Sequence, residues 1–246
     1  NLMYDFVIIG FGISGISFSK YAIMNNFKIL IIEKSNLFGG IWNSALNTTE
    51  LQTHKKYYQY DDFPMPSNYP IHPNKLQILK YLENVINFYK LDNHVKYNHK
   101  MLNSIFTNGS YKCEILNIIT NQIINIKSKY LIICNGYYNL PKYINTDNFS
   151  NKIIHIKNIN DYNFNIFKNK NVCIIGNGAS SCDLLKEMND LPNKLYVIYK
   201  HDKFFIKKVV YNISTAFIFN KYLLKIFKKI PIKLYLLLFK IVNLLL

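Results

Sequence analysis

The hydrophobic pattern of this chain opens with a short apolar run that leads directly into a glycine-rich turn. Residues 6–9 are Phe-Val-Ile-Ile, and three glycines follow over positions 10–15. A short run without polar residues is typical of a strand buried on both faces of a parallel sheet. Apolar residues continue over 16–24 in a helical pattern, and a second apolar run over 27–32 predicts another strand. The pattern therefore predicts a β-α-β unit, the building block of an α/β fold.

The same pattern returns near residue 171. Asn171 and the apolar run over 172–175 lead into a second glycine turn, a helix is expected through 188, and a further strand is expected over 194–199. Between the two units we predict a helix and several short strands. The helix covers 74–89, with Leu76, Leu79, Leu82, Ile86 and Tyr89 on its core-facing side, and the strands cover 95–97, 111–116, 123–126 and 130–133.

The first glycine turn has the spacing of a dinucleotide-binding motif. Gly10 allows a tight turn, Gly12 allows a pyrophosphate to approach the backbone, and Gly15 allows the helix to pack close to the strand. The helix starts around Ile13 and Ser14, and its free N–H groups and positive dipole end favour phosphate.

An acidic residue ends the second strand of this unit. Glu33, with Lys34 after it, lies about 20 residues beyond the glycines, where a carboxylate is placed to hold ribose hydroxyls. The alternative interpretation of Glu33 is a solvated strand end. We include both residues in the candidate site.

The second turn repeats the motif with one replacement. Its candidate residues are Gly176, Gly178, Ala179, Ser180 and Ser181. Ser181 replaces the third glycine and is still small enough for close packing of helix and strand. The strand after this turn is followed by Lys200, and a cation there favours a 2′-phosphate. We therefore expect NADPH at the second site, with an ordinary surface lysine as the alternative for Lys200.

The net charge alone overstates how strongly the composition favours nucleic-acid or membrane binding. The 246-residue chain is 50% apolar and carries a formal charge of +16, which by itself favours nucleic acid or a membrane surface. However, all 30 basic residues are Lys. Arg is the residue that recognises bases and phosphates bidentately, so its absence argues against sequence-specific nucleic-acid binding. Heavy use of Asn, Ile, Lys and Tyr is typical of AT-rich coding, and we attribute much of the charge to surface drift.

The cysteines indicate the cellular compartment, and the chain ends indicate that the sequence is a fragment. None of the four cysteines forms a C-x-x-C pair, and Cys134 and Cys173 lie in apolar runs, where reduced core thiols are expected. Reduced thiols, and a first apolar run already assigned to a strand, favour a cytoplasmic protein without a signal peptide. The chain begins with Asn1 and ends in the apolar run 241–246, which suggests a fragment.

A double glycine beside the single Trp carries a family resemblance. Phe38-Gly39-Gly40-Ile41-Trp42 begins five residues after Glu33. The order G-x-G-x-x-G, acid, G-G-x-W within fifty residues resembles the flavin-containing monooxygenases. In that family this loop lies along the flavin, so the resemblance implies that Gly40, Ile41 and Trp42 contact FAD. A glycine-rich loop with a packed Trp is the alternative.

Two further segments extend the resemblance. Leu51-Gln52-Thr53-His54 resembles a family segment that implies flavin contacts for Thr53 and His54, although a surface-loop His is equally open. Residues 149–159 match the family fingerprint F-x-G-x-x-x-H-x-x-x-Y/F only in part, because Asn151 and Ile159 replace the glycine and the aromatic residue. His155 matches the motif, and an ordinary strand residue is its alternative.

The resemblance implies an architecture. It implies two Rossmann-like, three-layer ββα dinucleotide-binding domains, the second inserted in the first. Residues 1–157 would form the N-terminal part of the FAD domain and 158–246 an incomplete NADPH domain. Compared with the family the chain is about half length. It would lack the remainder of the NADPH domain and the segment that completes the FAD domain.

The resemblance also implies an activity. NADPH would reduce FAD, O₂ would add at flavin C4a, and the hydroperoxide would oxygenate a nucleophilic nitrogen or sulfur of a small amine or sulfide. No acid–base pair or metal cluster is needed, and none is identified. The alternatives are a Baeyer–Villiger monooxygenase, a flavin disulfide reductase, which normally needs a C-x-x-C pair, and a truncated or inactive FAD-binding protein.

The last segment departs from this pattern. Residues 209–246 mix apolar stretches with lysines, and Pro231 divides the segment. Neither half provides 18 uninterrupted apolar residues, so a membrane-spanning helix is not expected. A peripheral membrane contact through an interfacial helix over 217–246 and an insertion packed on other parts of the protein remain alternatives.

Overall fold

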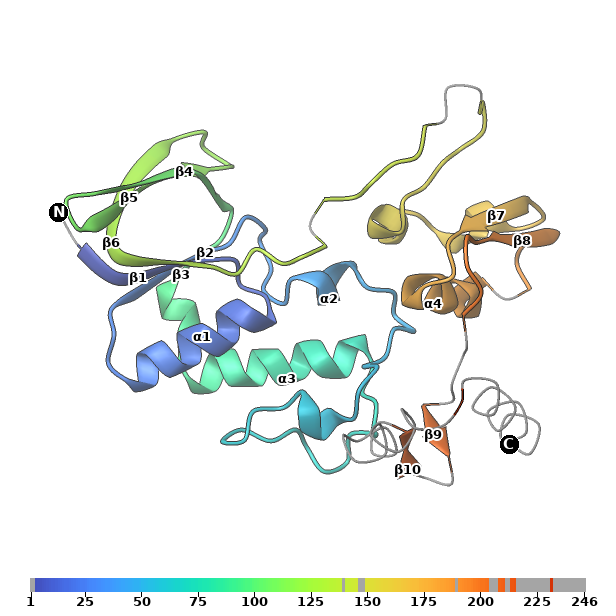
Figure 1. Ribbon diagram of the computed structural model, residues 1–246, viewed down its shortest axis with the longest axis horizontal. Helices are drawn as coiled ribbons and strands as arrows, with labels where there is room; N and C mark the ends of the chain where they lie inside the picture. Colours follow the sequence, from blue (N-terminus) through green and yellow to red (C-terminus); the bar gives the residue numbers. More distant parts are fainter. Residues whose placement is uncertain are drawn as a thin grey trace.

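The computed structural model describes residues 3–138, 140–145, 149–188, 190–203, 208–210, 213–215 and 231. A larger and a smaller body are visible in Figure 1. The larger body contains strands β1 (Met3–Ile9), β2 (Ile29–Ile32), β3 (Val95–Lys96), β4 (His99–Thr107), β5 (Ser110–Asn117) and β6 (Ile123–Ile133), helices α1 (Ile13–Met24), α2 (Ile41–Ser44) and α3 (Lys75–Phe88), and 3₁₀ helices η1 (Lys55–Tyr57) and η2 (Leu91–His94).

The smaller body follows in the chain. It contains 3₁₀ helices η3 (Ile156–Asp161) and η4 (Phe164–Phe167), strands β7 (Asn171–Ile175) and β8 (Lys194–Ile198), and helix α4 (Ala179–Met188). β7 and β8 form a parallel pair. A short antiparallel hairpin of β9 (Val209–Val210) and β10 (Ile213–Ser214) comes after it.

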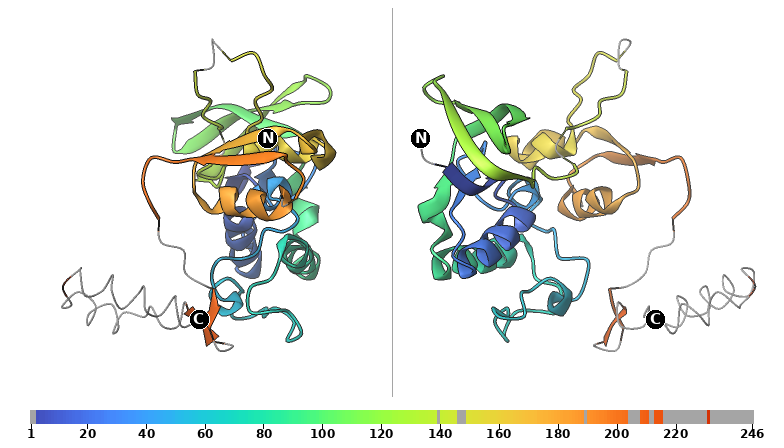
Figure 2. Two further views of the ribbon diagram at one scale, coloured as in Figure 1. Left: turned by 90° about the vertical axis from the view of Figure 1, so that its right-hand side faces the viewer. Right: turned by 60° about the vertical axis from the view of Figure 1, so that its left-hand side comes forward.

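One six-stranded sheet organises the larger body, in the order β3-β2-β1-β6-β5-β4. Strands β1, β2, β3 and the second half of β6 run parallel, whereas β4, β5 and the first half of β6 form an antiparallel meander. Helices α1 and α3 cover one face, and the meander bends away above the parallel strands (Figures 1 and 2). These are the three ββα layers that the resemblance implied, so the expected α/β fold is confirmed.

Strand β1 is buried on both faces, as its sequence predicts. Val7 and Ile8 are both 0% exposed. Ile8 packs into the cluster that includes residues of α1 and α3, and Val7 packs into a second cluster with residues of β5 and β6. Because neighbouring residues of a strand point to opposite faces, one strand contributes to both cores.

The sequence interpretation of the meander was wrong in two places. It missed β4, and it divided β6 into 123–126 and 130–133. The polar residues Lys127, Ser128 and Lys129 interrupt the apolar pattern, yet the strand continues through them because β6 changes partner there. Lys127 and Ser128 pair both with β5 and with β1, so hydrogen bonding on both edges maintains the strand where the pattern does not.

The core-facing side of α3 is shifted from the predicted one. Leu82 and Ile86 are buried, as predicted, but Leu76 is 62% exposed and Tyr81 is 0% exposed. The Tyr81 hydroxyl donates to the carbonyl of Phe63 at 2.8 Å and accepts from the amide of Tyr60 at 2.8 Å. A large side chain with a polar end is accommodated in a core when that end has partners, which an apolar periodicity cannot reveal.

The remaining expectations have mixed outcomes. All four cysteines are free, but Cys173 is exposed and only Cys113 is fully buried, so the expectation of a core thiol at Cys173 was wrong. Among the residues that the structure describes, no helix is long and apolar enough to cross a membrane. The proposed contact through 217–246 lies outside the described residues, apart from Pro231.

An unexpected ion pair holds α1 against the loop after η1. Lys20 is 0% exposed, and its ammonium donates to the carboxylate of Asp62. The same ammonium lies 4.8 Å from the ring centroid of Tyr60 and 5.3 Å from that of Tyr89. A lysine ammonium is stabilised by a paired carboxylate and by aromatic faces when water is excluded. The hydrogen bond from Lys20 lowers the pKa of Asp62.

We expect the two partners of this pair to respond differently to substitution. Asp62→Ala leaves a fully buried ammonium without its carboxylate and should destabilise the protein by about 3 kcal/mol. Lys20→Met keeps the apolar stem and leaves Asp62, whose side chain is 36% exposed, able to recover water. Urea unfolding of both variants measures the difference. Equal losses would contradict this asymmetry.

Candidate cofactor-binding sites

The first glycine turn lies at the carboxyl end of β1, where α1 begins. Gly10 has φ +102°, and a Cβ atom there would lie 2.4 Å from the carbonyl oxygen of Cys134. A Cβ atom at Gly15 would lie 2.0 Å from the carbonyl oxygen of Gly10. Both glycines are therefore required by the packing of the protein itself, in the roles that the sequence predicts.

Gly12 differs from its two neighbours in the motif. Of the described part of the chain, a Cβ atom there would meet only the Gly40 backbone, with Cα at 3.5 Å, which is an ordinary contact. Gly12 is the N-cap of α1 and provides no side-chain cap, so the first-turn N–H groups around Ile13 and Ser14 have no partner from that residue. The fold does not explain this glycine, whereas a phosphate group close to the backbone would explain it.

Glu33 connects the end of β2 to the same turn. It is 7% exposed, so the alternative of a solvated strand end is wrong. Its Oε2 accepts from the amide of Phe11 at 2.7 Å, and its Oε1 accepts from the amide and the hydroxyl of Ser35 at 2.9 and 3.0 Å. A carboxylate can accept about four hydrogen bonds, so one position remains for a ligand hydroxyl.

Lys34 is exposed at the edge of this site. Partial desolvation is the main cause that lowers its pKa, and the positive charges of Lys157 and Lys100 lower it further, against the opposing effect of Glu33. Lysines from three parts of the chain therefore raise the positive potential beside Glu33, which favours a phosphate-bearing ligand.

The G-G-x-W loop comes into direct contact with the first turn. The amide of Gly39 donates to the carbonyl of Phe11 at 2.9 Å, and a Cβ atom at Gly40 would lie 3.1 Å from Cα of Gly12. Two motifs separated in the sequence thus form one backbone surface. Ile41, at the start of α2, is 60% exposed beside it.

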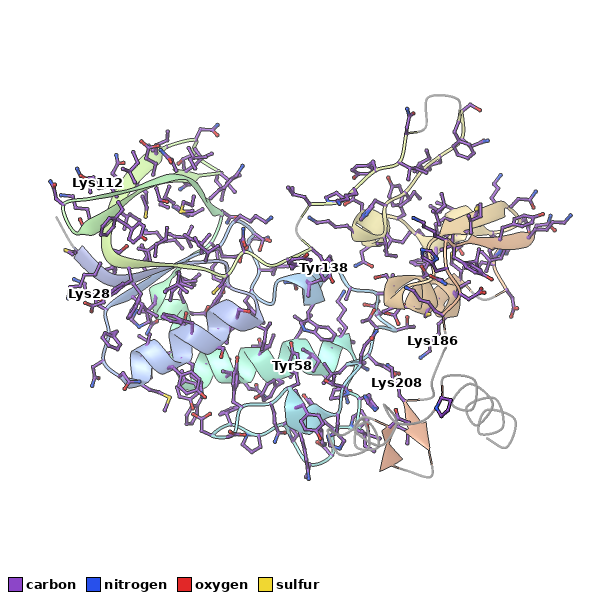
Figure 3. All side chains as sticks on the ribbon, viewed as in Figure 1. Lys28, Tyr58, Lys112, Tyr138, Lys186 and Lys208 are labelled. Carbon is purple, nitrogen blue, oxygen red and sulfur yellow. The ribbon has the colours of Figure 1, made fainter. Side chains whose placement is uncertain are left out.

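Trp42 points into the core instead. Its side chain is 9% exposed, and its indole nitrogen donates to the Tyr58 hydroxyl at 2.7 Å. Burial raises the pKa of Tyr58 to about 12, so this hydroxyl is neutral at physiological pH. The side chain of Trp42 is therefore packed, as the alternative interpretation expected, and its contact with flavin stays a prediction. Tyr58 is labelled in Figure 3.

Thr53 and His54 precede η1, which lies on the side of α3 away from the sheet (Figure 1). His54 is 8% exposed, so the interpretation as a surface-loop histidine was wrong. Its Nδ1 accepts from the amide of Lys56 at 3.0 Å. Desolvation, with the nearby charges of Lys56, His72 and Lys55, lowers its pKa, so the ring is neutral at pH 7. The carbonyl of Thr53 lies 3.0 Å from Nδ1 of His72, and flavin contacts of this loop stay a prediction.

The second glycine turn repeats the backbone geometry of the first. Gly176 has φ +112°, and its amide donates to the carbonyl of Ile198 at 2.7 Å. The equivalent bond in the first turn joins Gly10 to Ile32 at 2.8 Å. The Oγ atom of Ser181 lies 3.7 Å from the position of a Cβ atom at Gly176, so a small residue is accommodated there, as predicted.

Gly178 is the counterpart of Gly12. Among the residues that the structure describes, nothing lies within 4 Å of a Cβ atom at this position, so they again leave space beside the backbone. Ala179 and Ser180 are exposed at the start of α4, and Lys200 is exposed two residues beyond the end of β8. The turn can therefore receive a nucleotide, and the preference of Lys200 for a 2′-phosphate stays a prediction.

Sequence reasoning missed a set of polar contacts between the two bodies. Thr48 and Thr49 of the larger body bond to Glu187 and Asp183 of α4. A signal was present, because two acidic residues four positions apart share one helical face in a chain with only 14 acidic residues. His155 lies outside any strand: it N-caps η3, where its Nδ1 accepts from the amide of Lys157 at 3.1 Å.

The three glycines of the first turn should separate folding from binding. Gly10→Ala and Gly15→Ala each place a methyl group so that it overlaps a backbone carbonyl oxygen. We expect each substitution to destabilise the protein by about 1–3 kcal/mol. Gly12→Ala should leave the unfolding temperature close to wild type but remove nucleotide binding. Thermal unfolding and flavin titration measure both quantities. Unimpaired flavin binding by Gly12→Ala would contradict the assignment.

A family model matches the chain over a range that includes both glycine turns. The chain matches the family described as pyridine nucleotide-disulphide oxidoreductase over residues 7–236. It is 26% identical over 191 residues to a 4-hydroxybenzoate brominase (decarboxylating) of Marinomonas mediterranea, which covers 76% of this chain and 37% of that protein. It is 24% identical over 209 residues to human flavin-containing monooxygenase 1, which covers 77% of this chain and 39% of that protein.

Solved structures show the same fold. A flavin monooxygenase from Stenotrophomonas maltophilia superposes with a TM-score of 0.71 at 20% identity, over 85% of this chain and 60% of that one. OTEMO in complex with FAD and NADP superposes with a TM-score of 0.66 at 20% identity, over 79% of this chain and 38% of that one. The chain thus spans about two-fifths of the curated relatives. Since the family match extends from β1 past the second glycine turn, the protein belongs to the pyridine nucleotide-disulphide oxidoreductase family, with flavin-containing monooxygenases among its relatives, as its motifs indicated.

Proposed function

We propose that the protein binds FAD at the first glycine turn and NADPH at the second, and that it takes part in NADPH- and O₂-dependent oxygenation of a nucleophilic nitrogen or sulfur in a small molecule. The observation that carries the proposal is the repeated turn, with the equivalent amide-to-carbonyl bonds from Gly10 and Gly176. Each turn has a middle glycine, Gly12 or Gly178, that the packing of the protein does not require.

The residues present fit these cofactors. At the first turn, the three described hydrogen bonds to Glu33 leave one accepting position for a ribose hydroxyl, and the first-turn N–H groups of α1, which receive no side-chain cap from Gly12, can donate to a pyrophosphate. At the second turn, the space beside Gly178 allows the pyrophosphate of a second nucleotide to approach. Flavin supplies the redox and oxygen chemistry when it is bound.

The contribution of this chain is therefore binding and orientation. Gly39 and Gly40 place the backbone of their loop against Gly12, which forms a continuous surface beside the expected dinucleotide. The indole of Trp42 anchors this loop through its hydrogen bond to Tyr58. Related proteins support the reaction class: one is named a flavin-containing monooxygenase, and OTEMO is in complex with FAD and NADP.

The visible spectrum of the purified chain tests the flavin assignment. We expect the absorbance bands of oxidised flavin, bleaching on addition of NADPH, and recovery of the bands in air. Turnover with a sulfide or a tertiary amine supports oxygenation of a nucleophile, whereas turnover only with a ketone supports the Baeyer–Villiger alternative. A colourless protein that does not take up added FAD would refute the proposal for this chain.

Lys200 should determine which nicotinamide cofactor is preferred. A charge-assisted hydrogen bond is worth about 1.5–3 kcal/mol, so Lys200→Ala should reduce the preference for NADPH over NADH by about tenfold or more. Binding of NADH should change little. Titration of wild type and variant with both nucleotides measures the ratio, and Lys142→Ala, an exposed lysine outside both turns, is the control. An unchanged ratio would show that Lys200 does not contact the 2′-phosphate.

A further inference from the structure

Helix α4 of the smaller body rests its acidic face on one loop of the larger body. The amide of Thr48 donates to Oε1 of Glu187 at 2.9 Å, and the hydroxyl of Thr49 donates to Oδ2 of Asp183 at 2.8 Å. Asp183 and Glu187 are one helical turn apart, so both carboxylates lie on the same face of α4. Two charge-assisted hydrogen bonds therefore join adjacent residues of the loop to successive turns of the helix.

Glu50 extends this contact with two ion pairs. Its carboxylate lies 3.5 Å from Nζ of Lys186 and 3.1 Å from Nζ of Lys208, and both lysines are labelled in Figure 3. Partial burial raises the pKa of Glu50, but Lys208 and Lys186 outweigh that effect and hold its pKa below the usual value. Lys186 belongs to α4, so its pair with Glu50 adds a charge contact between helix and loop, whereas Lys208 lies directly before β9. Charge complementarity of this kind favours one orientation of α4 on the loop.

The loop itself is held firmly by the larger body. The amide of Lys75 donates to the carbonyl of Thr49 at 2.9 Å, and the amide of Leu51 donates to the carbonyl of Pro73 at 2.8 Å. The ammonium of Lys75 donates to the carbonyl of Ala45 at 2.8 Å. Asn160, from η3 of the smaller body, donates to the same carbonyl at 3.0 Å. The loop therefore provides α4 with a surface that is fixed to α3.

The position of α4 determines the position of the second glycine turn. Helix α4 begins at Ala179, within that turn, and Asp183 lies four residues further on. On the other side, the loop follows α2 and therefore continues directly from Gly39 and Gly40 at the first turn. The contact joins the two candidate nucleotide sites through short, continuous segments.

We propose that Asp183 and Glu187 are positioning residues that, through Thr48 and Thr49, hold the second nucleotide site at a fixed place relative to the first. We call the set Thr48, Thr49, Glu50, Asp183, Lys186 and Glu187 the latch. This role rests on the proposed function, because the relative position of the two sites sets the distance over which a hydride is transferred.

The hydride leaves NADPH, which becomes NADP⁺, and reduces the flavin without a further reactant. Such a transfer needs reacting atoms about 3–3.5 Å apart, and a shift of about 1 Å can cost about a hundredfold in rate.

The first test needs no cofactor. Small-angle X-ray scattering of the apo chain should show a larger radius of gyration for Asp183→Ala and for Thr49→Val than for wild type. Asp183→Asn keeps an accepting oxygen for the Thr49 hydroxyl and should remain close to wild type. Glu114→Ala and Thr107→Val are the matched controls, since both residues lie on the meander, away from the latch. Unchanged scattering by both latch variants would overturn the proposal.

The second test measures flavin reduction under anaerobic conditions in a stopped-flow instrument. Each of Asp183→Ala and Thr49→Val should slow reduction by saturating NADPH about tenfold, and the double variant should lose no more than either single variant, because both remove the same contact. Reduction by dithionite, which needs no second site, should keep its wild-type rate. Additive losses in the double variant, or an equal loss with dithionite, would overturn the role of the latch.

The two arms distinguish failure of the latch from failure of the proposed function. If the chain takes up no flavin, the proposed function fails, while the scattering result still supports or overturns the contact between α4 and its loop. If flavin binds and NADPH reduces it at the wild-type rate in both latch variants, the proposed function stands and the positioning role is refuted.

Discussion

The structure depends on the close approach of three backbone segments around Gly10. The end of β1, the first turn of α1 and the residue that follows β6 approach so closely that a single methyl group at Gly10 or Gly15 would overlap a carbonyl oxygen. Helix α1 can pack on the sheet only because these side chains are missing. The loop at Gly40 adds a fourth segment against Gly12. The same closeness that forms the core also leaves a bare strip of backbone on which a dinucleotide can lie.

Lysine has more structural roles here than the net charge suggests. We attributed much of the positive charge to drift at the surface, and many lysines are indeed exposed. Lys20 and Lys75, however, are buried: the ammonium of Lys20 pairs with Asp62 of a loop, and that of Lys75 donates to the carbonyls of Asn43 in α2 and of Ala45 directly after it. Their long stems cross apolar surroundings while the ammonium groups fix the segments packed against their helices. In this sequence, which contains no arginine, two buried lysines therefore connect α1 and α3 to the segments beside them.

Local motifs were predictable because their causes are local. The run before Gly10, the acidic Glu33 at the end of β2 and the recurrence at Gly176 follow from spacing alone, and the structure has strands and turns at those places. The long-range contacts of individual side chains were not predictable. Asp62 lies in a loop, so nothing in its neighbourhood points to Lys20, and Asp183 reveals its role only when the two bodies are placed together. Strand β6 was divided because its polar residues mark a change of neighbour, which periodicity interprets as an end.

Because β6 pairs with β5 in its first half and with β1 in its second half, the two halves are expected to fold in a definite order. Its first half pairs with β5 across a short turn, so the meander is made of contacts between residues that are near in sequence. Its second half must find β1, which places Tyr4 opposite Ser128. Contacts between sequence neighbours form faster than contacts that close long loops. The meander is thus expected to assemble first and to present the free half of β6 as a ready template, on which the parallel sheet, the glycine turn and α1 are then completed.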